Sequence, residues 1–409
     1  MRALRTGHHV QLLQGGQTYF PALVRAIDRA AHEVRMETYI FDLDPSGQLV
    51  AAALVRAARR GLAVYLVMDG AGTPALAQDW ARQFDEAGVH WHIFSPVANL
   101  GWLIPHRWRR LHRKLCVLDG RVAFCGGINV LDDFYDSNHG ALSEPRFDFS
   151  VRVTGPLVRD VHEAVSQFWW RVQTARNVRS RDFSAAWLAL QEVVGLAWED
   201  EAEAETAFSP KASDPQRRSA KADLLLRDNL RHRGSIERAY RKAIAGARQE
   251  VIIANAYFLP GRKLRKALIH AAQRGVKVRL LLQGRYEYFL QFHAVRLVYG
   301  VLLQAGVEIH EYAPSFLHAK VAVIDGHWAT VGSSNLDPLS LLLAREANVV
   351  VDDADFAHEL RHRLVQAMEQ HGLRVDPAHY ARRPWQQRLR DLLAYGVMRL
   401  GVFLTGHRY

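Results

Sequence analysis

His318-Ala-Lys-Val-Ala-Val-Ile-Asp-Gly326 runs on to Gly332-Ser-Ser-Asn335 in the second half of the chain. Residues 321–324 are apolar and mostly β-branched, which predicts a buried strand. Because residues two apart on a strand share a face, His318 and Lys320 point to the same side. An imidazole and an ammonium group are therefore expected to project together from this strand.

The Asp325-Gly326 pair is a strong signal for a tight hairpin. If the pair forms a two-residue loop, the returning strand places Ser333 opposite His318, with Asn335 one step further on the same face. A hydroxyl and an amide then join the imidazole and the ammonium, and such groups are suited to holding an anionic phosphate. Asp325 lies seven residues after His318, an odd spacing. It therefore faces the opposite side, and we expect it to be a turn residue with a structural role.

The same pattern occurs earlier, as His112-Arg-Lys-Leu-Cys-Val-Leu-Asp-Gly120 followed by Gly126-Gly-Ile-Asn129. A separation of 206 residues relates the two histidines, and the same separation relates the two asparagines. One such motif would be a weak signal, but two copies in the same register are a strong one. By the same spacing argument, Asp119 is expected to be a turn residue. Two halves that each carry half a site predict a pseudo-twofold pair whose hairpins face each other across a shared cleft.

The segments around the two motifs also repeat, and they alternate between helical and strand patterns. This alternation predicts an α/β fold in which each half is a mixed, mainly parallel sheet flanked by helices. Helices are predicted over residues 18–35, 47–60, 75–86, 236–247 and 264–274, and strands over 34–41, 62–68, 89–94, 251–257, 276–282 and 307–312. The predicted parts of the chain are a first half (1–198), a linker that begins with an acidic run (199–221), a second half (222–375) and a basic amphipathic C-terminal tail (376–409).

The 409 residues carry a net charge of +11 with a pI near 9.8, which points to an anionic partner, either nucleic acid or an acidic membrane surface. Cys116 and Cys125, one on each strand of the first hairpin, are expected to be buried, reduced thiols. No cysteine and histidine cluster has zinc-ligand spacing, and we expect neither a metal nor a cofactor. No window has the ~20 apolar residues that span a bilayer, and the N-terminus is too polar for a signal peptide, so we expect a cytosolic or peripheral membrane protein.

Two further segments each allow two interpretations. Residues 99–113 hold Trp102 and Trp108 among several arginines, and form either an exposed basic loop or a basic, aromatic rim beside the site. Such a rim suits lipid and nucleic-acid bases equally, so composition does not separate the two. The stretch from Pro384 to Tyr409 has leucines at helical spacing with arginines around them. It forms either a helix at a membrane surface or a helix packed on the catalytic body.

Two imidazoles and two ammonium groups around one phosphodiester suffice for a displacement without a metal. One neutral histidine attacks phosphorus and forms a phosphohistidine, while the other, protonated, gives its proton to the leaving alcohol and then deprotonates the incoming one. Asp148 and Glu346, each of which follows its hairpin, are candidates to orient the imidazoles and to set their protonation states. The candidate catalytic residues are His112, Lys114, His318 and Lys320, and the candidate substrate-binding residues are Asn129, Ser333 and Asn335.

These paired motifs resemble the signature of the phospholipase D superfamily, His-x-Lys-x4-Asp followed by Gly-x-x-Asn, and the resemblance covers nearly the whole chain. More narrowly, residues 250–258 and 327–340 resemble bacterial cardiolipin synthases of the B type. This resemblance implies a phosphatidyltransferase. It would carry a phosphatidyl group on His112 and pass it to the hydroxyl of phosphatidylglycerol, releasing glycerol, with His318 as acid and base.

The resemblance and the spacing argument differ at two points. The resemblance implies Asp119 and Asp325 as catalytic residues, whereas their spacing from the histidines indicates turn residues. Gly127 stands where the superfamily has serine, so the first copy lacks one hydroxyl donor. This difference weakens a symmetric view of the two halves.

The partners that the resemblance implies are anionic phospholipid substrates and a membrane surface, with no nucleic acid. The expected place is the cytoplasmic face of the inner membrane, with peripheral attachment. A rival enzyme is a phospholipase D, or a phosphodiesterase or nuclease, because attack by water on the same intermediate gives hydrolysis. A non-enzymatic basic scaffold for membranes or nucleic acids would require both motif copies to be idle.

Overall fold

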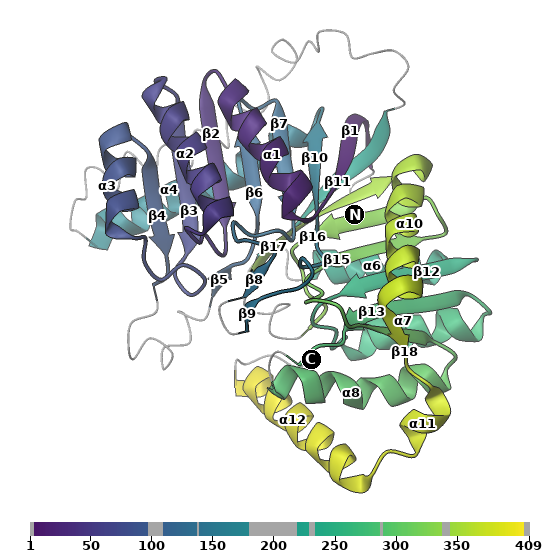
Figure 1. Ribbon diagram of the computed structural model, residues 1–409. Helices are drawn as coiled ribbons and strands as arrows, with labels where there is room; N and C mark the ends of the chain where they lie inside the picture. The colour runs from purple at the N-terminus through teal and green to yellow at the C-terminus, as the bar shows by residue number, and fades with distance from the viewer. Residues whose placement is uncertain are drawn as a thin grey trace.

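The computed structural model describes residues 4–96, 109–136, 139–179, 219–228, 234–286, 289–337 and 344–404. Within these ranges the chain forms two halves with the same order of elements, which lie beside each other in Figure 1. The repeat inferred from the paired motifs is therefore present in three dimensions.

In the first half, helices alternate with strands up to the hairpin that follows His112. The predicted helices and strands are present with shifted ends, whereas β1 was not predicted because polar residues interrupt its apolar pattern. The helices are α1 (Gly15–Arg29), α2 (Pro45–Arg59), α3 (Gln78–Ala87) and α4 (Leu157–Arg179). The strands are β1 (Arg5–Gln14), β2 (Glu33–Thr38), β3 (Ala63–Asp69), β4 (His90–Phe94), β5 (Arg110–Leu111), β6 (Leu115–Leu118), β7 (Val122–Gly126), β8 (Tyr135–Asp136), β9 (Gly140–Ala141) and β10 (Phe149–Thr154).

The second half repeats this order and adds a C-terminal extension. Residues 220 and 221, predicted to belong to the linker, are the first two residues of β11, and residues 199–218 lie outside the described ranges. The helices are α6 (Ser235–Gly246), α7 (Arg262–Gln273), α8 (Phe289–Gln304), α10 (Ala354–His371), α11 (Pro377–Ala381) and α12 (Trp385–Leu404). The strands are β11 (Ala220–Arg227), β12 (Glu250–Asn255), β13 (Lys277–Gln283), β14 (Glu308–Tyr312), β15 (Lys320–Ile324), β16 (Trp328–Gly332), β17 (Ala344–Asp352) and β18 (Gly372–Arg374).

One mixed sheet runs through both halves, in the order β18-β14-β13-β12-β15-β16-β17-β11-β1-β10-β7-β6-β2-β3-β4. The order is mirrored about the β11–β1 pair, as a pseudo-twofold relation requires. Parallel pairing joins β2, β3 and β4, their counterparts β12, β13 and β14, and β5 with β17. The predicted mixed sheet is confirmed, but antiparallel pairs outnumber parallel ones. The helix–strand alternation stops at each motif, and the hairpins continue the sheet antiparallel.

The two half-sheets pack face to face. Val117 and Val151 of the first half share one buried cluster with Val323 and Val349 of the second, together with apolar residues of α4 and α10. The opposite face of the first half-sheet is covered by α1 and α2, and that of the second by α6, α7 and α8. Alternate residues of each strand thus enter different cores, which is why the strands are apolar on both faces. Face-to-face packing also brings the first residues of β6 and of β15 toward each other. These two strands begin just after His112 and His318.

Candidate active site

Each motif hairpin has a loop one residue longer than predicted. Ile324 pairs with Trp328, so the loop comprises three residues and not two. Asp325 and Gly326 both have positive φ, 50° and 68°, and the N–H of His327 donates to the carbonyl of Ile324 at 3.3 Å. This hydrogen bond closes the turn before strand pairing resumes. The predicted register of the second hairpin is therefore wrong by one residue, and the first hairpin has the same three-residue loop, with Leu118 paired to Val122.

The changed register gives Ser333 a different partner. Its hydroxyl donates to Oε2 of Glu346 at 2.5 Å, and the N–H of Ala347 donates to the same hydroxyl at 3.0 Å. Ser333 therefore does not lie opposite His318 as predicted. It supports a carboxylate, and that carboxylate belongs to the site of the other histidine.

The two halves exchange backbone hydrogen bonds directly at the histidines. The N–H of His112 donates to the carbonyl of Arg345, and the N–H of His318 donates to the carbonyl of Phe147, both at 3.0 Å. β5, which precedes His112, pairs with the start of β17 in the second half. Each histidine is thus fixed against the backbone of the opposite half. The residue that accepts its hydrogen bond is the one directly before Glu346 or Asp148.

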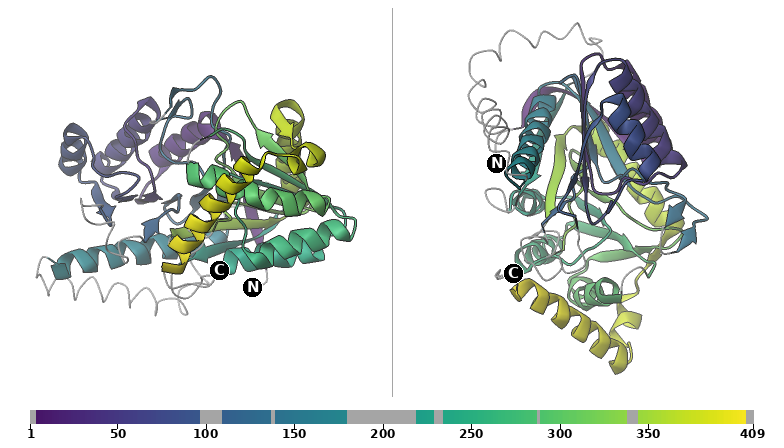
Figure 2. Two further views of the ribbon diagram at one scale, coloured as in Figure 1. Left: turned by 90° about the horizontal axis from the view of Figure 1, so that it is seen from below. Right: turned by 90° about the vertical axis from the view of Figure 1, so that its left-hand side faces the viewer.

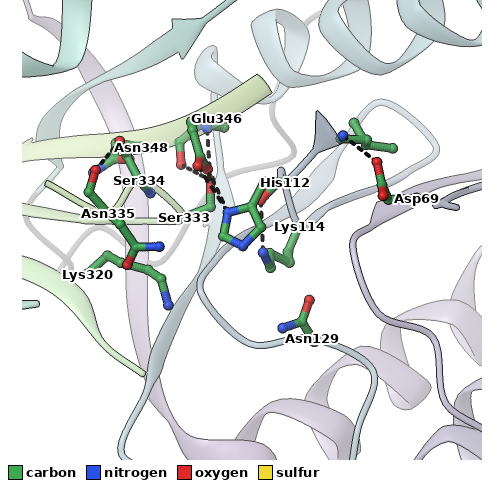
Figure 3. Close-up of polar contacts among 12 residues, drawn as sticks. Asp69, His112, Lys114, Asn129, Lys320, Ser333, Ser334, Asn335, Glu346 and Asn348 are labelled. Atoms are coloured by element: carbon green, nitrogen blue, oxygen red, sulfur yellow. Dashed lines mark hydrogen bonds and ion pairs between the residues drawn. The ribbon is translucent and has the colours of Figure 1, made fainter. Parts of the chain in front are cut away.

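These backbone contacts produce two crossed imidazole–carboxylate pairs. Nδ1 of His112 lies 3.0 Å from Oε1 of Glu346, and Nδ1 of His318 lies 2.6 Å from Oδ2 of Asp148. An ionised carboxylate only accepts, so Nδ1 carries the hydrogen in each ring and Nε2 keeps its lone pair. The predicted orienting carboxylates are therefore in contact with the imidazoles, but each serves the histidine of the other half. Figure 3 shows the pair formed by His112 and Glu346.

The pKa values of both imidazoles are lowered, which favours the neutral form in the free protein. Burial lowers the pKa of His112; Glu346 opposes this effect and the charge of Lys114 adds to it. Burial, followed by the charges of Lys320 and Lys114, lowers the pKa of His318 well below its usual value. The charge of His112 also contributes to the lowered pKa of His318. Their side chains remain 15% and 24% exposed, which leaves them accessible to a substrate.

The other charges of the site are shifted by the same burial. Burial raises the pKa of Asp148 to about 6, although the charge of Lys320 opposes this. Burial lowers the pKa of Lys114 to about 7; the charge of Glu346 opposes this effect and that of Lys320 adds to it. Such shifts in several neighbouring groups are typical of active sites.

The lysines and asparagines of both motifs lie in the same region. Nζ of Lys114 donates to the carbonyl of His112 at 2.9 Å, and Nζ of Lys320 donates to the carbonyl of His318. Figure 3 shows Lys114, Asn129 and Lys320 around His112 on the side away from Glu346. The amide oxygen of Asn129 accepts from the N–H of Ile40 at 3.2 Å, which leaves its NH₂ group to donate to a ligand. Asn335 is buried beside these groups.

Asp119 and Asp325 bind backbone, not imidazole. The carboxylate of Asp119 accepts from the N–H groups of residues 31–33 at 2.8–2.9 Å, and that of Asp325 accepts from residues 248–250 at 2.8–2.9 Å. Burial raises the pKa of each carboxyl, but the backbone donors outweigh it, and both pKa values lie below normal. Each aspartate therefore fastens its turn to the start of β2 or β12. These contacts support the structural role expected from spacing, in place of the catalytic role that the resemblance implied.

Sequence reasoning missed one aromatic neighbour of the site. The ring of Tyr39 packs edge-on against His112 with centroids 4.9 Å apart, and Nζ of Lys114 lies 5.4 Å from the centre of the same ring. Tyr39 follows β2 and no motif spacing marks it. Its contact depends on the pairing of β2 with β6, which only the fold supplies.

Three other expectations concern the surroundings of the site. Trp102 and Trp108 lie outside the described ranges. Cys116 and Cys125 are buried free thiols, as expected, and burial raises the pKa of both to about 12. In the part of the chain that the structure describes, no three His, Cys, Asp or Glu residues are grouped to hold a metal ion.

The contact between Gly127 and Asp148 yields a prediction. A Cβ at position 127 would lie 2.3 Å from Oδ1 of Asp148, so a serine cannot supply the missing hydroxyl without displacing the carboxylate from His318. We expect Gly127→Ser to lower kcat by roughly 10–100-fold. The matched control is Gly246→Ser on α6, where a Cβ meets nothing within 4 Å. Steady-state kcat values of the two purified variants test this expectation. An undiminished kcat in Gly127→Ser would show that Asp148 has room to move.

Comparisons with known proteins identify the family of the chain. A family model described as "Cardiolipin synthase, PLD-like domain" matches residues 23–144 and 240–368, one stretch in each half. The chain is 37% identical to Cardiolipin synthase B of Escherichia coli (strain K12) over 402 residues, which cover 98% of this chain and 90% of that protein. It is 28% identical to Cardiolipin synthase of Geobacillus kaustophilus, over 95% of this chain and 73% of that protein.

The fold also matches that of a solved structure. Phosphatidylserine synthase of Haemophilus influenzae Rd KW20 matches with a TM-score of 0.64 at 13% identity, over 98% of this chain and 96% of that one. At this identity the likeness concerns the fold alone. Because one family model matches both repeats and a relative is 37% identical along nearly the whole chain, the chain belongs to the cardiolipin synthase family of phospholipase D-like proteins.

Proposed function

We propose that the protein is a phosphatidyltransferase that joins two phosphatidylglycerol molecules into cardiolipin and releases glycerol. The observation that carries this proposal is the pair of crossed contacts, His112 with Glu346 and His318 with Asp148, in one site with two lysines. The lipid substrate rests on the family, whose members in Escherichia coli and Geobacillus kaustophilus are named cardiolipin synthases.

The first step forms a covalent intermediate. Nε2 of His112 attacks phosphorus of one phosphatidylglycerol, a P–N bond forms, and the P–O bond to glycerol breaks. The entering phosphodiester brings negative charge beside His318, which favours its protonated form, and this imidazolium gives its proton to the leaving glycerol oxygen. The ammonium groups of Lys114 and Lys320 and the amides of Asn129 and Asn335 stabilise the charge on the non-bridging oxygens.

The second step reverses the first with a different alcohol. His318, now neutral, takes the proton from the glycerol hydroxyl of a second phosphatidylglycerol. The resulting oxygen attacks phosphorus, the P–N bond to His112 breaks, and cardiolipin leaves. Both histidines return to their starting states, so the cycle balances without a cofactor. Attack by water at this step would give phosphatidic acid instead.

The substrates of such a reaction lie in a bilayer, so we propose peripheral attachment at the cytoplasmic face of the inner membrane. None of the described helices has the length and hydropathy of a membrane span. The net charge of +11 favours a surface of anionic lipid.

Product analysis tests the proposed function. The purified protein is incubated separately with phosphatidylglycerol, with phosphatidylethanolamine and with single-stranded DNA, and the products are identified by mass spectrometry. Cardiolipin and glycerol in equal amounts are expected from phosphatidylglycerol. Phosphatidic acid as the main product would establish a phospholipase D in its place, and nucleotide fragments would establish a nuclease.

The pH dependence of kcat/KM gives a further prediction, since it reports the ionisation of the free enzyme. Lys114, with its pKa lowered to about 7, is charged below that pH and loses its charge above it. Activity should therefore fall as pH rises through about 7. His112 must be neutral to attack phosphorus, and its pKa is lowered, so the acid limb should lie below about pH 6.5.

Lys114→Arg isolates the alkaline limb, because a guanidinium group remains protonated. We expect lower activity but an alkaline limb moved up by more than about one pH unit. Lys221→Arg, at an exposed lysine of β11, is the control and should leave the profile unchanged. An alkaline limb that stays near pH 7 in Lys114→Arg would assign it to another group.

A further inference from the structure

One face of α12 exposes a row of large apolar side chains. Trp385 is 68% exposed, Leu393 60% and Leu400 58%, values that are high for residues of this size. The exposed row recurs at helical spacing and so occupies a single face. It consists of Trp385, Leu389, Leu392, Leu393, Val397 and Leu400.

The opposite face of α12 is packed on the protein and fixes the direction of this row. Ala394 and Met398 are buried in the core of the second half. Asp391 is buried as well; it accepts from Arg383 at 2.8 Å and lies 2.9 Å from Nδ1 of His293 on α8. The apolar row therefore points away from the protein. Figure 1 and the right-hand view of Figure 2 show α12 at one end of the molecule, and the left-hand view, from below, shows it at the front.

The surroundings of the row are cationic. Arg388, Arg390 and Arg399 are exposed on the same helix, and Arg382 is exposed just before it. Exposed apolar patches of this extent mark interaction sites. Aliphatic and Trp side chains bordered by arginine suit the boundary between acyl chains and anionic headgroups, whereas a protein partner gains nothing from such a border unless it is acidic.

Two further exposed apolar residues lie on α8, the helix on which α12 packs. Phe289 and Leu290, at the start of α8, are 49% and 41% exposed, and the ring of Phe289 packs on His293, the partner of α12. Nearby, Tyr286 lines an open cavity together with Arg285, His139 and Phe316. Phe316 lies two residues before His318. The cavity thus lies between residues near the start of α8 and the segment that leads into His318.

We propose that the apolar row of α12, with Phe289 and Leu290, is the surface on which the protein docks onto an anionic lipid bilayer. Two residues of this docking face, Phe289 and Leu290, begin α8 and follow closely after Arg285 and Tyr286, which line the cavity. The inference rests on the proposed function, which requires substrates drawn from a bilayer, and it names the part of the chain that meets them.

Vesicle flotation of the full chain tests the docking face. Leu392→Glu/Leu393→Glu is expected to weaken partitioning onto vesicles of phosphatidylglycerol and phosphatidylcholine by more than about tenfold, because two leucines lose their burial in lipid. The matched control is Leu49→Glu/Leu373→Glu, since these leucines are 59% and 65% exposed, against 54% and 60% at the tested positions. The control should bind vesicles as the unmodified chain does. Equal vesicle binding by Leu392→Glu/Leu393→Glu would overturn the proposal.

A second measurement separates the docking face from the chemistry. With short-chain phosphatidylglycerol below its micelle concentration, Leu392→Glu/Leu393→Glu should retain activity within about twofold, because no bilayer is involved. Vesicle binding through α12 without any transfer product would overturn the proposed function and leave the docking face standing. A change from dimer to monomer in sedimentation, with vesicle binding intact, would identify the face as a contact between copies and overturn the proposal.

Discussion

Replacing His112 by alanine is expected to lower the turnover of phosphatidylglycerol by more than about 10⁴-fold, because the covalent route loses its nucleophile. His318→Ala is expected to cost about 10²–10⁴-fold, the usual contribution of a general acid and base. Measured kcat values for the natural lipid give these two losses. They do not yet assign the roles, because both variants are nearly inactive.

An activated substrate assigns the roles. A phosphodiester with a nitrophenolate leaving group needs no proton from an acid, so His318→Ala should still form the phosphohistidine on His112. We expect a burst of about one nitrophenolate per enzyme, followed by slow turnover, since the same residue is needed to activate the acceptor. His112→Ala should give no burst. The reverse pattern, a burst in His112→Ala alone, would make His318 the nucleophile.

His327→Ala is the matched control for both variants. His327 lies in the loop of the hairpin that follows His318. It pairs with Asp352 at 3.0 Å, but its side chain is 57% exposed. Its loss should leave turnover unchanged. A chelator should also leave the unmodified protein active, because the proposed route uses nitrogen and oxygen groups of the chain alone. Strong inhibition by a chelator would contradict that route.

The chemistry of the site could be predicted because it is encoded locally. The motif at His318 places an imidazole and an ammonium on one strand, and its second copy at His112 implies a partner. The spacing of Asp119 and Asp325 also indicated that they face away. Each of these inferences needs only the alternation of a single strand and the self-similarity of the chain.

The missed features depend on contacts between distant residues. The three-residue loop of the second hairpin is held by Asp325, whose carboxylate accepts three N–H groups at the start of β12. The residues in this contact are more than seventy positions apart in the sequence. The crossed carboxylates follow from the pairing of β5 with β17 and of Phe147 with Leu317. No local pattern contains this exchange, so sequence placed Glu346 and Asp148 near the site without saying which histidine each one holds.

That crossing makes a prediction about which chemical step each carboxylate supports. Glu346→Gln keeps the shape of the side chain but removes the charge that fixes the tautomer of His112. We expect kcat to fall by about 10³-fold, as for other carboxylates that orient a catalytic imidazole. Ser333→Ala removes only the hydroxyl bonded to Glu346, and the expected loss is about tenfold. In single-turnover experiments the burst itself should be slowed in Glu346→Gln, although Glu346 belongs to the second half.

Asp148→Asn should behave in the opposite way. Asp148 orients His318, so its loss should slow the two proton transfers. Turnover of phosphatidylglycerol is expected to fall by about 10³-fold, whereas the burst with the activated substrate should remain. Asp352→Asn removes the carboxylate of an exposed pair and serves as the control. If Glu346→Gln instead spares the burst and Asp148→Asn abolishes it, each carboxylate acts on the histidine of its own half. If the crossed assignment holds, neither half contains a complete histidine–carboxylate pair, and the activity of this protein requires both repeats to fold against each other.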